Sequence, residues 1–490
     1  MKTQRLSVIE KIGYSLGDLA ANLIFQTLIT YLAYFYTDIY GLSGADAGAI
    51  IFIVGTVAAY TFNPIVGALA DRTNSKWGKF RPWILWTAVP LGVISVLTFT
   101  TPDFSYSGKL IYAVVTYTLL LLLYSGSNLP YSALSGVITG DMKERNSISS
   151  YRFVAVMFAQ FFVQVFMLPI IKYVGGGDKA EGFEITMIWL AIIVTILLLI
   201  TFITTRERII PKPEQESSLK EDFQDLIKNR PWIIMLTATI LLFTTLAMKG
   251  GAYLYYFENY VSYKSLDEFV YPILEFLSTI GIKFDDPVSA GFGIFNAGGI
   301  IFMIIGIGLS KPLADKYGKR NVFGVFLFIS TIFIFIFYFV SSSALNLIFG
   351  FQILHGFFYG VTIPLLWAMI ADVADYSEWK NNRRATAIIF SAMMVGLKLG
   401  VTFGQSIIPV FLENYGYIKE EFGKNLFILN GSYVRTFIDQ SESAVNATKT
   451  LVSILPSIPF LITVGLMYFY SIDKKTEQII QHELSSRRIK

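Results

Sequence analysis

Long apolar stretches alternate with short polar segments along the whole chain. A helix that crosses the hydrocarbon core of a bilayer needs about 20 mostly apolar residues. The pattern therefore predicts twelve membrane-spanning helices, near residues 12–37, 46–70, 82–101, 108–137, 148–173, 184–205, 232–258, 288–313, 321–341, 343–371, 384–413 and 449–471. The break between the ninth and tenth helices depends on three consecutive serines, Ser341 to Ser343. Several stretches are longer than a bilayer requires, so we expect tilted or protruding helices.

Composition agrees with a membrane protein. Hydrophobic residues make up 54% of the 490 residues and charged residues only 15%, against about 25% charged residues in soluble domains. A soluble protein of this composition would expose large apolar patches. The net charge of +4 gives no indication of a nucleic-acid partner, and the chain has no cysteine and two histidines, His355 and His482. These counts exclude disulfides and thiolate metal sites, so we expect no cofactor and no metal.

Positive charge is distributed unequally between the polar segments. The polar segments that lie on the same side of the membrane as the N-terminus contain about three times as many Lys and Arg residues as the segments on the opposite side. Such an excess is typical of the cytoplasmic side. We therefore expect a multi-pass protein of the cell inner membrane with both termini in the cytoplasm.

A polar segment with two prolines divides the chain into halves of six predicted spans each. The predicted parts are a six-helix bundle at 1–205, a cytoplasmic linker at 206–231, a second six-helix bundle at 232–472 and a cytoplasmic tail at 473–490. The second part of the linker has the composition of an amphipathic helix on the membrane surface. Two outer loops, 259–287 and 414–448, are long.

One sequence pattern occurs twice, about half a chain apart. Leu-Ala-Asp, a basic residue and then Gly-Lys stand around Asp71 and again around Asp315, and two prolines are each followed by an aspartate and then by arginine. An acid at a helix end can pair with basic residues of the adjoining loop or with the N-terminus of a neighbouring helix. Such a loop either latches helices at the inner face or is a solvated segment that only sets topology. Two matched copies favour the gates of a transporter built from parallel repeats. The predicted gating residues are Asp71, Arg72, Asp141, Arg145, Asp315, Lys319, Asp375 and Arg383.

Four ionisable residues lie deep in the predicted spans, namely Asp18, Arg152, Lys249 and Lys398. Such residues are costly in lipid and usually face a cavity or a partner. Either Asp18 pairs with Arg152 or with Lys398 and holds the two halves together, or these residues contact a polar substrate. Their net positive charge suggests an anionic sugar such as a hexuronide, with a neutral glycoside as the alternative. Asp18 is the only acid in this set and is therefore the candidate carrier of a coupling proton.

Aromatic residues accompany the deep charges. Tyr253 and Tyr256 follow Lys249 at four and seven residues, and so share its helix face. This stripe would either line a cavity or pack in the core.

Several short motifs together resemble those of the glycoside–pentoside–hexuronide:cation symporters, the family of melibiose permease within the major facilitator superfamily. The residues that carry the resemblance are Gly13-Tyr-Ser-Leu-Gly17-Asp18, Tyr34-Phe-Tyr-Thr-Asp38, Asn63-Pro64, Asp71-Arg72-Thr73, Trp77-Gly-Lys-Phe-Arg-Pro82, Asn128-Leu-Pro130 and Ala371-Asp372-Val-Ala-Asp375-Tyr376-Ser-Glu378-Trp379. The resemblance covers most of the chain except the two long outer loops. It implies an all-α membrane protein of the major facilitator type, with twelve transmembrane helices in two six-helix pseudo-repeat halves.

The resemblance also implies a substrate site. Asp18, Tyr124, Asn128, Arg152, Trp367 and Lys398 match sugar-site or cavity-lining positions of the family, and Lys249 joins this set because of its depth. The cation site departs from the family pattern. The second span has Asn63-Pro64 without the family's carboxylates, Asn128 replaces an aspartate of melibiose permease, and Ser125 keeps a hydroxyl. Hard cations prefer charged oxygen ligands, so the candidate cation-coupling residues Asp18, Asn63, Ser125 and Asn128 favour a proton over sodium.

These observations predict a secondary transporter that moves a sugar or glycoside by alternating access in symport with a cation, H+ rather than Na+. An uncoupled sugar facilitator is the alternative. A membrane enzyme or a channel is disfavoured, because the sequence has no cluster of catalytic residues and repeats its gating loops. The expected partners are the sugar, the coupling cation and the lipid bilayer, without nucleic acid, and we expect a functional monomer.

Overall fold

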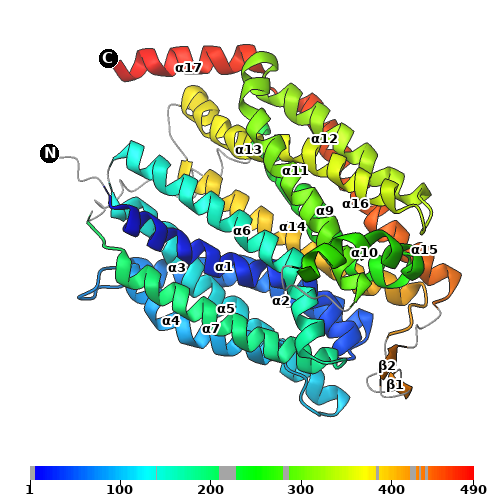
Figure 1. Ribbon diagram of the computed structural model, residues 1–490. Helices are drawn as coiled ribbons and strands as arrows, with labels where there is room; N and C mark the ends of the chain where they lie inside the picture. Colours follow the sequence, from blue (N-terminus) through cyan, green and yellow to red (C-terminus); the bar gives the residue numbers. More distant parts are fainter. Residues whose placement is uncertain are drawn as a thin grey trace. The chain divides into compact units, whose positions relative to one another are not determined.

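The computed structural model describes residues 6–139, 141–208, 228–279, 286–381, 386–419, 426–429, 432–435 and 440–489. Figure 1 shows an arrangement built almost wholly of helices. The elements up to residue 208 are α1 (Val8–Tyr34), η1 (Phe35–Ile39), α2 (Gly44–Val57), η2 (Ala58–Phe62), α3 (Asn63–Arg72), α4 (Arg81–Thr98), α5 (Tyr106–Ile138), α6 (Met142–Val174) and α7 (Lys179–Thr204). Both η1 and η2 are π-helical turns.

The elements from residue 228 onward are also mainly helical. They are α9 (Arg230–Asn259), α10 (Tyr263–Thr279), α11 (Pro287–Tyr317), α12 (Lys319–Ile336), the 3-10 turn η3 (Phe337–Phe339), α13 (Leu345–Asn381), α14 (Thr386–Asn414), β1 (Leu426–Leu429), β2 (Ser432–Arg435), α15 (Glu442–Val452), α16 (Ile454–Phe469) and α17 (Lys474–Ile489).

Among the described residues, twelve helical spans are long and apolar enough to cross a membrane. They coincide with the twelve predicted spans, although several ends differ. The ninth span, Lys319–Phe339, and the tenth, Leu345–Lys380, are separated at the three serines, as predicted. The last span begins earlier than predicted, at Glu442, because α15 precedes α16 with a turn at Ser453.

Three segments contain structure that the hydrophobic pattern does not indicate. Helix α10 lies in the predicted outer loop 259–287, and β1 pairs with β2 in an antiparallel hairpin within 414–448. Helix α17 occupies the predicted tail, and its Ile480 and Leu484 are buried in a hydrophobic core. The amphipathic helix expected in the linker falls largely outside the described residues.

The chain clusters into two compact units. The first comprises described residues within 1–213, 270–293 and 409–441, and in it α1 packs against α6 and α7, and α4 against α5 and α7. The second comprises those within 214–269, 294–408 and 442–490, and in it α12 packs against α13 and α16, and α9 against α15 and α16. The domain boundaries expected from the sequence stay a prediction.

Two local features shape the first unit. Gly17 lets α5 approach α1 closely, because a Cβ at this position would lie 2.4 Å from Cε2 of Tyr131. Pro64 stands in the first turn of α3, directly after the π-helical turn η2. Proline has no N–H to donate within a helix, and π turns inside helices are frequent at functional sites. Both features therefore lie where the sequence places candidate site residues.

Candidate functional site

An ion pair joins α1 and α6 inside the first unit. Nε of Arg152 donates a hydrogen bond to Oδ2 of Asp18 at 2.6 Å, across 134 residues of sequence. The exposed fractions of the two side chains are 29% for Arg152 and 9% for Asp18. A buried charge without a partner is costly, so each residue permits the burial of the other. The structure thus brings together two of the predicted substrate-site residues.

Two tyrosines form a platform beside this pair. The rings of Tyr14 and Tyr131 stack with centroids 4.6 Å apart, and the hydroxyl of each donates to the backbone carbonyl of the other, at 3.0 and 2.8 Å. The Arg152 guanidinium lies 5.8 Å from the centroid of the Tyr14 ring and 5.5 Å from that of Tyr131. Cation–π attraction adds to the ion pair in holding the guanidinium. Both rings are buried, so the platform is fixed by packing.

The other predicted residues of this half lie along α5. Nδ2 of Asn128 donates to the hydroxyl of Tyr124 at 3.2 Å, one helical turn away. Phe25 of α1 stacks on the Tyr124 ring with centroids 6.3 Å apart. Tyr124, Asn128 and Tyr131 follow one another at helical spacing, so α5 presents a polar aromatic stripe beside α1. The same helical spacing, visible in the sequence, would have identified Tyr131 as a candidate site residue.

The candidate cation-coupling residues other than Asp18 lie on two packed helices. Asn63 begins α3 after the π-helical turn, while Ser125 and Asn128 are on α5, and these two helices are in contact. Ser125 is buried. Within the described residues, no group of three His, Asp or Glu side chains is placed to hold a metal ion.

Two of the predicted gating residues of the first half, Asp71 and Arg145, form local contacts. Lys79 pairs with Asp71 at 2.9 Å within their own loop, and Arg72 is exposed at the end of α3. Nε and one terminal nitrogen of Arg145 donate to the carbonyls of Thr139 and Gly136, both at 2.9 Å. Arg145 therefore satisfies carbonyls at the end of α5, as cations do at helix C-termini.

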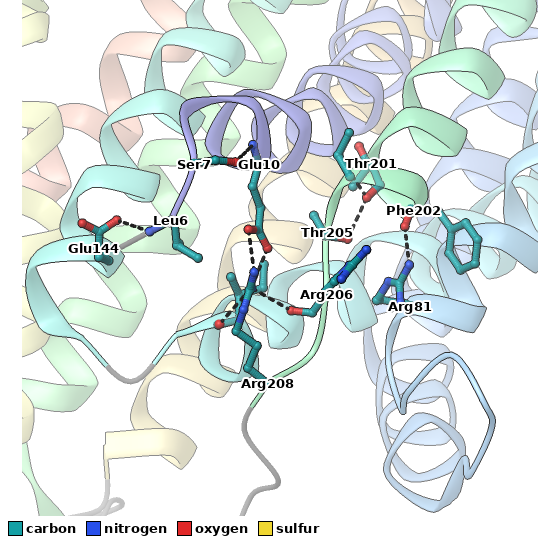
Figure 2. A network of polar contacts seen from close by, with 12 residues as sticks. Leu6, Ser7, Glu10, Arg81, Glu144, Thr201, Phe202, Thr205, Arg206 and Arg208 are labelled. Carbon is teal, nitrogen blue, oxygen red and sulfur yellow. Dashed lines mark hydrogen bonds and ion pairs between the residues drawn. The ribbon is translucent and has the colours of Figure 1, made fainter. Parts of the chain in front are cut away.

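A second polar network in this unit was not expected from the sequence. Figure 2 shows Glu10 of α1 facing Arg208, with contacts of 2.6 and 2.8 Å from the two terminal nitrogens to the two carboxylate oxygens. Hydrogen bonding to Glu10 raises the pKa of Arg208. Glu144 of α6 accepts from the Leu6 backbone and pairs with Lys11 at 2.9 Å. Hydrogen bonding to Lys11 lowers the pKa of Glu144.

Glu207 closes the same region by capping α4. Its carboxylate accepts from the backbone N–H groups of Lys79, Phe80 and Arg81 at 2.8, 2.7 and 2.9 Å. The first N–H groups of a helix have no acceptor within the helix. Here a carboxylate from the segment after α7 provides the missing acceptor.

The matched loop of the second half pairs differently. Nζ of Lys319 lies 2.6 and 2.7 Å from the two carboxylate oxygens of Asp372, and 3.0 Å from Oε1 of Glu477 on α17. Asp315, the predicted gating acid of this loop, accepts through its backbone carbonyl from Lys474. Asp375 lies one turn beyond Asp372 on α13, and Arg383 lies outside the described residues.

The three remaining substrate-site residues belong to the second unit, on α9, α13 and α14. Lys249 is 5% exposed and contacts His355 of α13. Trp367 is 36% exposed on α13, and Lys398 lies on α14.

The aromatic stripe after Lys249 is buried. The Tyr253 hydroxyl donates to Oε1 of Gln352 at 3.1 Å. Tyr256 packs against Tyr260 and Phe337, with ring centroids 5.1 and 6.3 Å away. Of the two alternatives for this stripe, the structure therefore favours core packing.

Comparison with known proteins decides the family. Residues 13–284 and 282–474 match the family described as "MFS/sugar transport protein". The inner membrane symporter YicJ of Escherichia coli (strain K12) is 33% identical over 99% of this chain and 96% of its own length. The chain belongs to the glycoside–pentoside–hexuronide symporters of the major facilitator superfamily.

Other relatives of this chain have names that refer to sugars. The isoprimeverose transporter of Lactiplantibacillus pentosus is 28% identical over 95% of this chain and 89% of its own length. The glucuronide carrier protein homolog of Escherichia coli (strain K12) is 27% identical over 99% and 97%. A solved structure of a bacterial homologue of the human lysosomal transporter Spinster has a TM-score of 0.63, with 14% identity over 97% of this chain and 99% of that one, which shows a shared fold.

Membership in the symporter family confirms several predictions from the sequence. The chain is a multi-pass membrane protein with the twelve-helix major facilitator fold. It is a secondary sugar transporter of the symporter type and not an enzyme.

Proposed function

We propose that this symporter binds a sugar or glycoside at the Asp18–Arg152 pair and couples its movement to a proton. The observation that carries the proposal is the ion pair held over the Tyr14–Tyr131 platform in a buried part of the first unit. A sugar needs several hydrogen-bonding groups within a mostly aromatic lining. A carboxylate accepts from sugar hydroxyls and a guanidinium donates to them.

The charge of this site favours an uncharged glycoside. Asp18 already neutralises Arg152, so the arginine is a weak anchor for a substrate carboxylate. Tyr124 and Asn128 add neutral donors and acceptors along α5. An anionic hexuronide is the second candidate, supported by Lys249 and Lys398 and by the relative named as a glucuronide carrier.

The coupling ion proposed is H+. Asn63, Ser125 and Asn128 offer amide and hydroxyl oxygens without a carboxylate, and sodium prefers charged oxygen ligands. An uncoupled facilitator is the alternative.

Further parts of the proposal concern the whole carrier. The excess of Lys and Arg supports an inner-membrane protein with both termini in the cytoplasm. The ion pairs of Asp71 with Lys79 and of Asp372 with Lys319 support gates on that side. We propose that the monomer is the working unit.

Counterflow in proteoliposomes tests the substrate proposal. The probes are nitrophenyl glycosides of glucose, galactose and xylose, together with nitrophenyl glucuronide. We expect saturable counterflow of at least one uncharged glycoside, faster than that of the glucuronide. A preference for the glucuronide would transfer the proposal to the second candidate.

A matched pair of variants tests the site. Arg152→Gln should abolish counterflow, whereas Arg206→Gln, at an exposed arginine after α7 that belongs neither to the site nor to a gate, should retain it. Retained counterflow in Arg152→Gln would contradict the proposed site. Transport assayed with and without sodium, and with and without an imposed pH gradient, identifies the ion.

A further inference from the structure

Three buried polar side chains form a chain across the second unit. Nζ of Lys249 on α9 contacts Nε2 of His355 on α13, and Nδ1 of His355 lies 2.7 Å from Oγ of Ser330 on α12. The exposed fractions of these residues are 5%, 5% and 0%. Neither the proposed substrate pair nor the gates use His355 or Ser330.

Aromatic rings surround this chain. The Tyr253 ring centroid lies 5.4 Å from Nζ of Lys249. The Tyr359 ring stacks on the imidazole with centroids 5.9 Å apart, and Phe460 of α16 stacks on Tyr359 at the same distance. Phe295 of α11 packs edge-on against Tyr253. The pair of bases therefore lies in a surrounding of low polarity.

Within the described residues, no carboxylate contacts Lys249 or His355. Asp372 of α13 is held by Lys319, and Lys449 of α15 lies over the rings of Tyr260 and Tyr338. Lys398, a further cationic group of this unit, lies on α14, which packs against α9 at Gly400 and Gly404. Positive charge on the Lys249–His355 pair is thus not offset by an acid in contact with it.

Two bases in contact can hold one proton readily but not two. With Lys249 protonated, its ammonium donates to Nε2 of His355, and Nδ1–H donates to Oγ of Ser330 or to its carbonyl at 3.2 Å. With Lys249 neutral, Nε2–H donates to the amine and the Ser330 hydroxyl donates to Nδ1. Two added protons would place donors face to face and two positive charges in contact, which costs much where the dielectric constant is low. The chain therefore has two fully hydrogen-bonded states that differ by one proton.

Asp18 is less suited to exchange a proton. It is tied to Arg152 at 2.6 Å, and its protonation would leave a largely buried guanidinium without a charge partner. The Lys249–His355 pair changes charge without breaking any ion pair.

We propose that Lys249, His355 and Ser330 form the site that binds and releases the coupling proton of this carrier. The inference rests on the proposed symport with H+. The proton comes from water on one side of the membrane, binds to the amine–imidazole pair, and leaves the pair to water on the other side.

Proteoliposomes separate coupling from sugar movement. Counterflow of the glycoside that wild-type protein moves fastest measures exchange without a driving force, and accumulation under a pH gradient measures coupling. We expect His355→Gln to keep counterflow and to lose accumulation, so that the internal sugar concentration equals the external one. His482→Gln, at the exposed other histidine on α17, should keep both activities.

The outcomes distinguish the inference from the proposal on which it rests. Wild-type protein that shows counterflow but ignores the pH gradient would refute proton symport, and this inference with it. Wild-type protein that responds to the gradient, with His355→Gln accumulating sugar equally well, would refute this inference alone.

A direct measurement covers the case in which His355→Gln fails to fold. His482→Gln leaves His355 as the single histidine, so imidazole-labelled protein gives one set of histidine NMR signals. We expect these signals to report a change of proton occupancy between about pH 5 and about pH 8, the range in which imidazoles commonly titrate. Lys249→Met should shift the pH at which the change occurs. Signals that stay constant over this range in both proteins would overturn the inference.

Discussion

Asp18 and Arg152 each supply the charge that makes burial of the other tolerable. Their contact is reinforced by the Tyr14–Tyr131 platform, whose hydroxyls are already used in backbone hydrogen bonds. The platform therefore positions the guanidinium through its ring faces and leaves polar contact with a substrate to the ion pair. The tyrosine platform thus contributes to stability, whereas the ion pair contributes both to stability and to substrate binding.

Single and double variants test that separation. Asp18→Asn should lower the free energy of unfolding by about 3 to 5 kcal/mol, because Arg152 then remains buried without its partner. The double variant Asp18→Asn/Arg152→Gln should recover most of this loss yet fail to bind sugar. Chemical unfolding in detergent and glycoside binding measure the two effects. A double variant no more stable than Asp18→Asn would argue against the pairing.

Gly17 is the residue on which the platform depends sterically. In Gly17→Ala the new methyl would lie 2.4 Å from the Tyr131 ring, so the ring must move off Tyr14. Overpacking of this kind costs about 1 to 3 kcal/mol. Gly308→Ala, in α11 with no atom within 4 Å of the new methyl, should be neutral or slightly stabilising. Equal unfolding temperatures of the two variants would show that α1 and α5 can separate without cost.

Elements related by the internal repeat use the same residue in different ways. Lys79 and Lys319 occupy matching positions after Gly78 and Gly318. Lys79 pairs with Asp71, whose side chain is 68% exposed, whereas Lys319 bridges Asp372 and Glu477, with exposed fractions of 14% and 21%. The second latch thus joins three helices and draws α17 into the unit.

The same substitution at the two lysines should have unequal effects. Lys79→Met removes a mainly exposed ion pair and should cost less than about 1 kcal/mol. Lys319→Met leaves Asp372 largely buried without its cation and should cost several times more. Thermal unfolding measures the difference, and restoration by the double variant Lys319→Met/Asp372→Asn would attribute it to the pair. A larger effect at Lys79 would contradict this asymmetry.

The contact between the N-terminal helix and α6 should depend on pH. Hydrogen bonding to Lys11 holds the pKa of Glu144 below its ordinary value of 4.5. A carboxyl with a lower pKa in the folded state stabilises that state above the unfolded-state pKa, and the contribution disappears as the pH falls through the folded value. The stability difference between wild-type protein and Glu144→Gln should therefore be full at neutral pH, begin to decrease near pH 4.5 and disappear as the pH falls through the lower folded-state value. A stability difference that stays unchanged from neutral pH to well below pH 4.5 would contradict this dependence.

At the scale of the whole molecule, the hydrophobic pattern predicts the twelve spans because a helix that crosses a bilayer needs about 20 mostly apolar residues, a property that is local in the sequence. The motifs predict the family for a similar reason: each is a short run of residues, such as turn glycines and loop charges, that can be recognised without knowledge of the fold. The pattern does not indicate α10, the β1–β2 hairpin or α17. These elements are short or polar, so their packing partners, such as the core that covers Ile480 and Leu484, decide their structure.

Side-chain partners across distant helices could be predicted only in part. The charges alone leave two possible partners for Asp18, Arg152 and Lys398, and the structure pairs it with Arg152. Spacing alone does not predict the pair of Lys319 with Asp372, because the two residues are 53 positions apart and lie on different helices. The sequence does not indicate a role for His355, because a single histidine in an apolar helix is usually a packed core residue. Its significance appears only when Lys249 and Ser330 arrive from two other helices.

The orientation in the membrane is open to a direct test, because the chain contains no cysteine. Asp103→Cys and Gln478→Cys each introduce a single exposed thiol, one in the loop before α5 and the other on α17. If both termini are cytoplasmic, a membrane-impermeant maleimide should label Asp103→Cys in intact cells and Gln478→Cys only after the cells are opened. The reverse pattern would place the basic loops outside and contradict the orientation. It would also place the latches of Lys79 and Lys319 on the outer side, so the labelling decides which solution the proposed gates face.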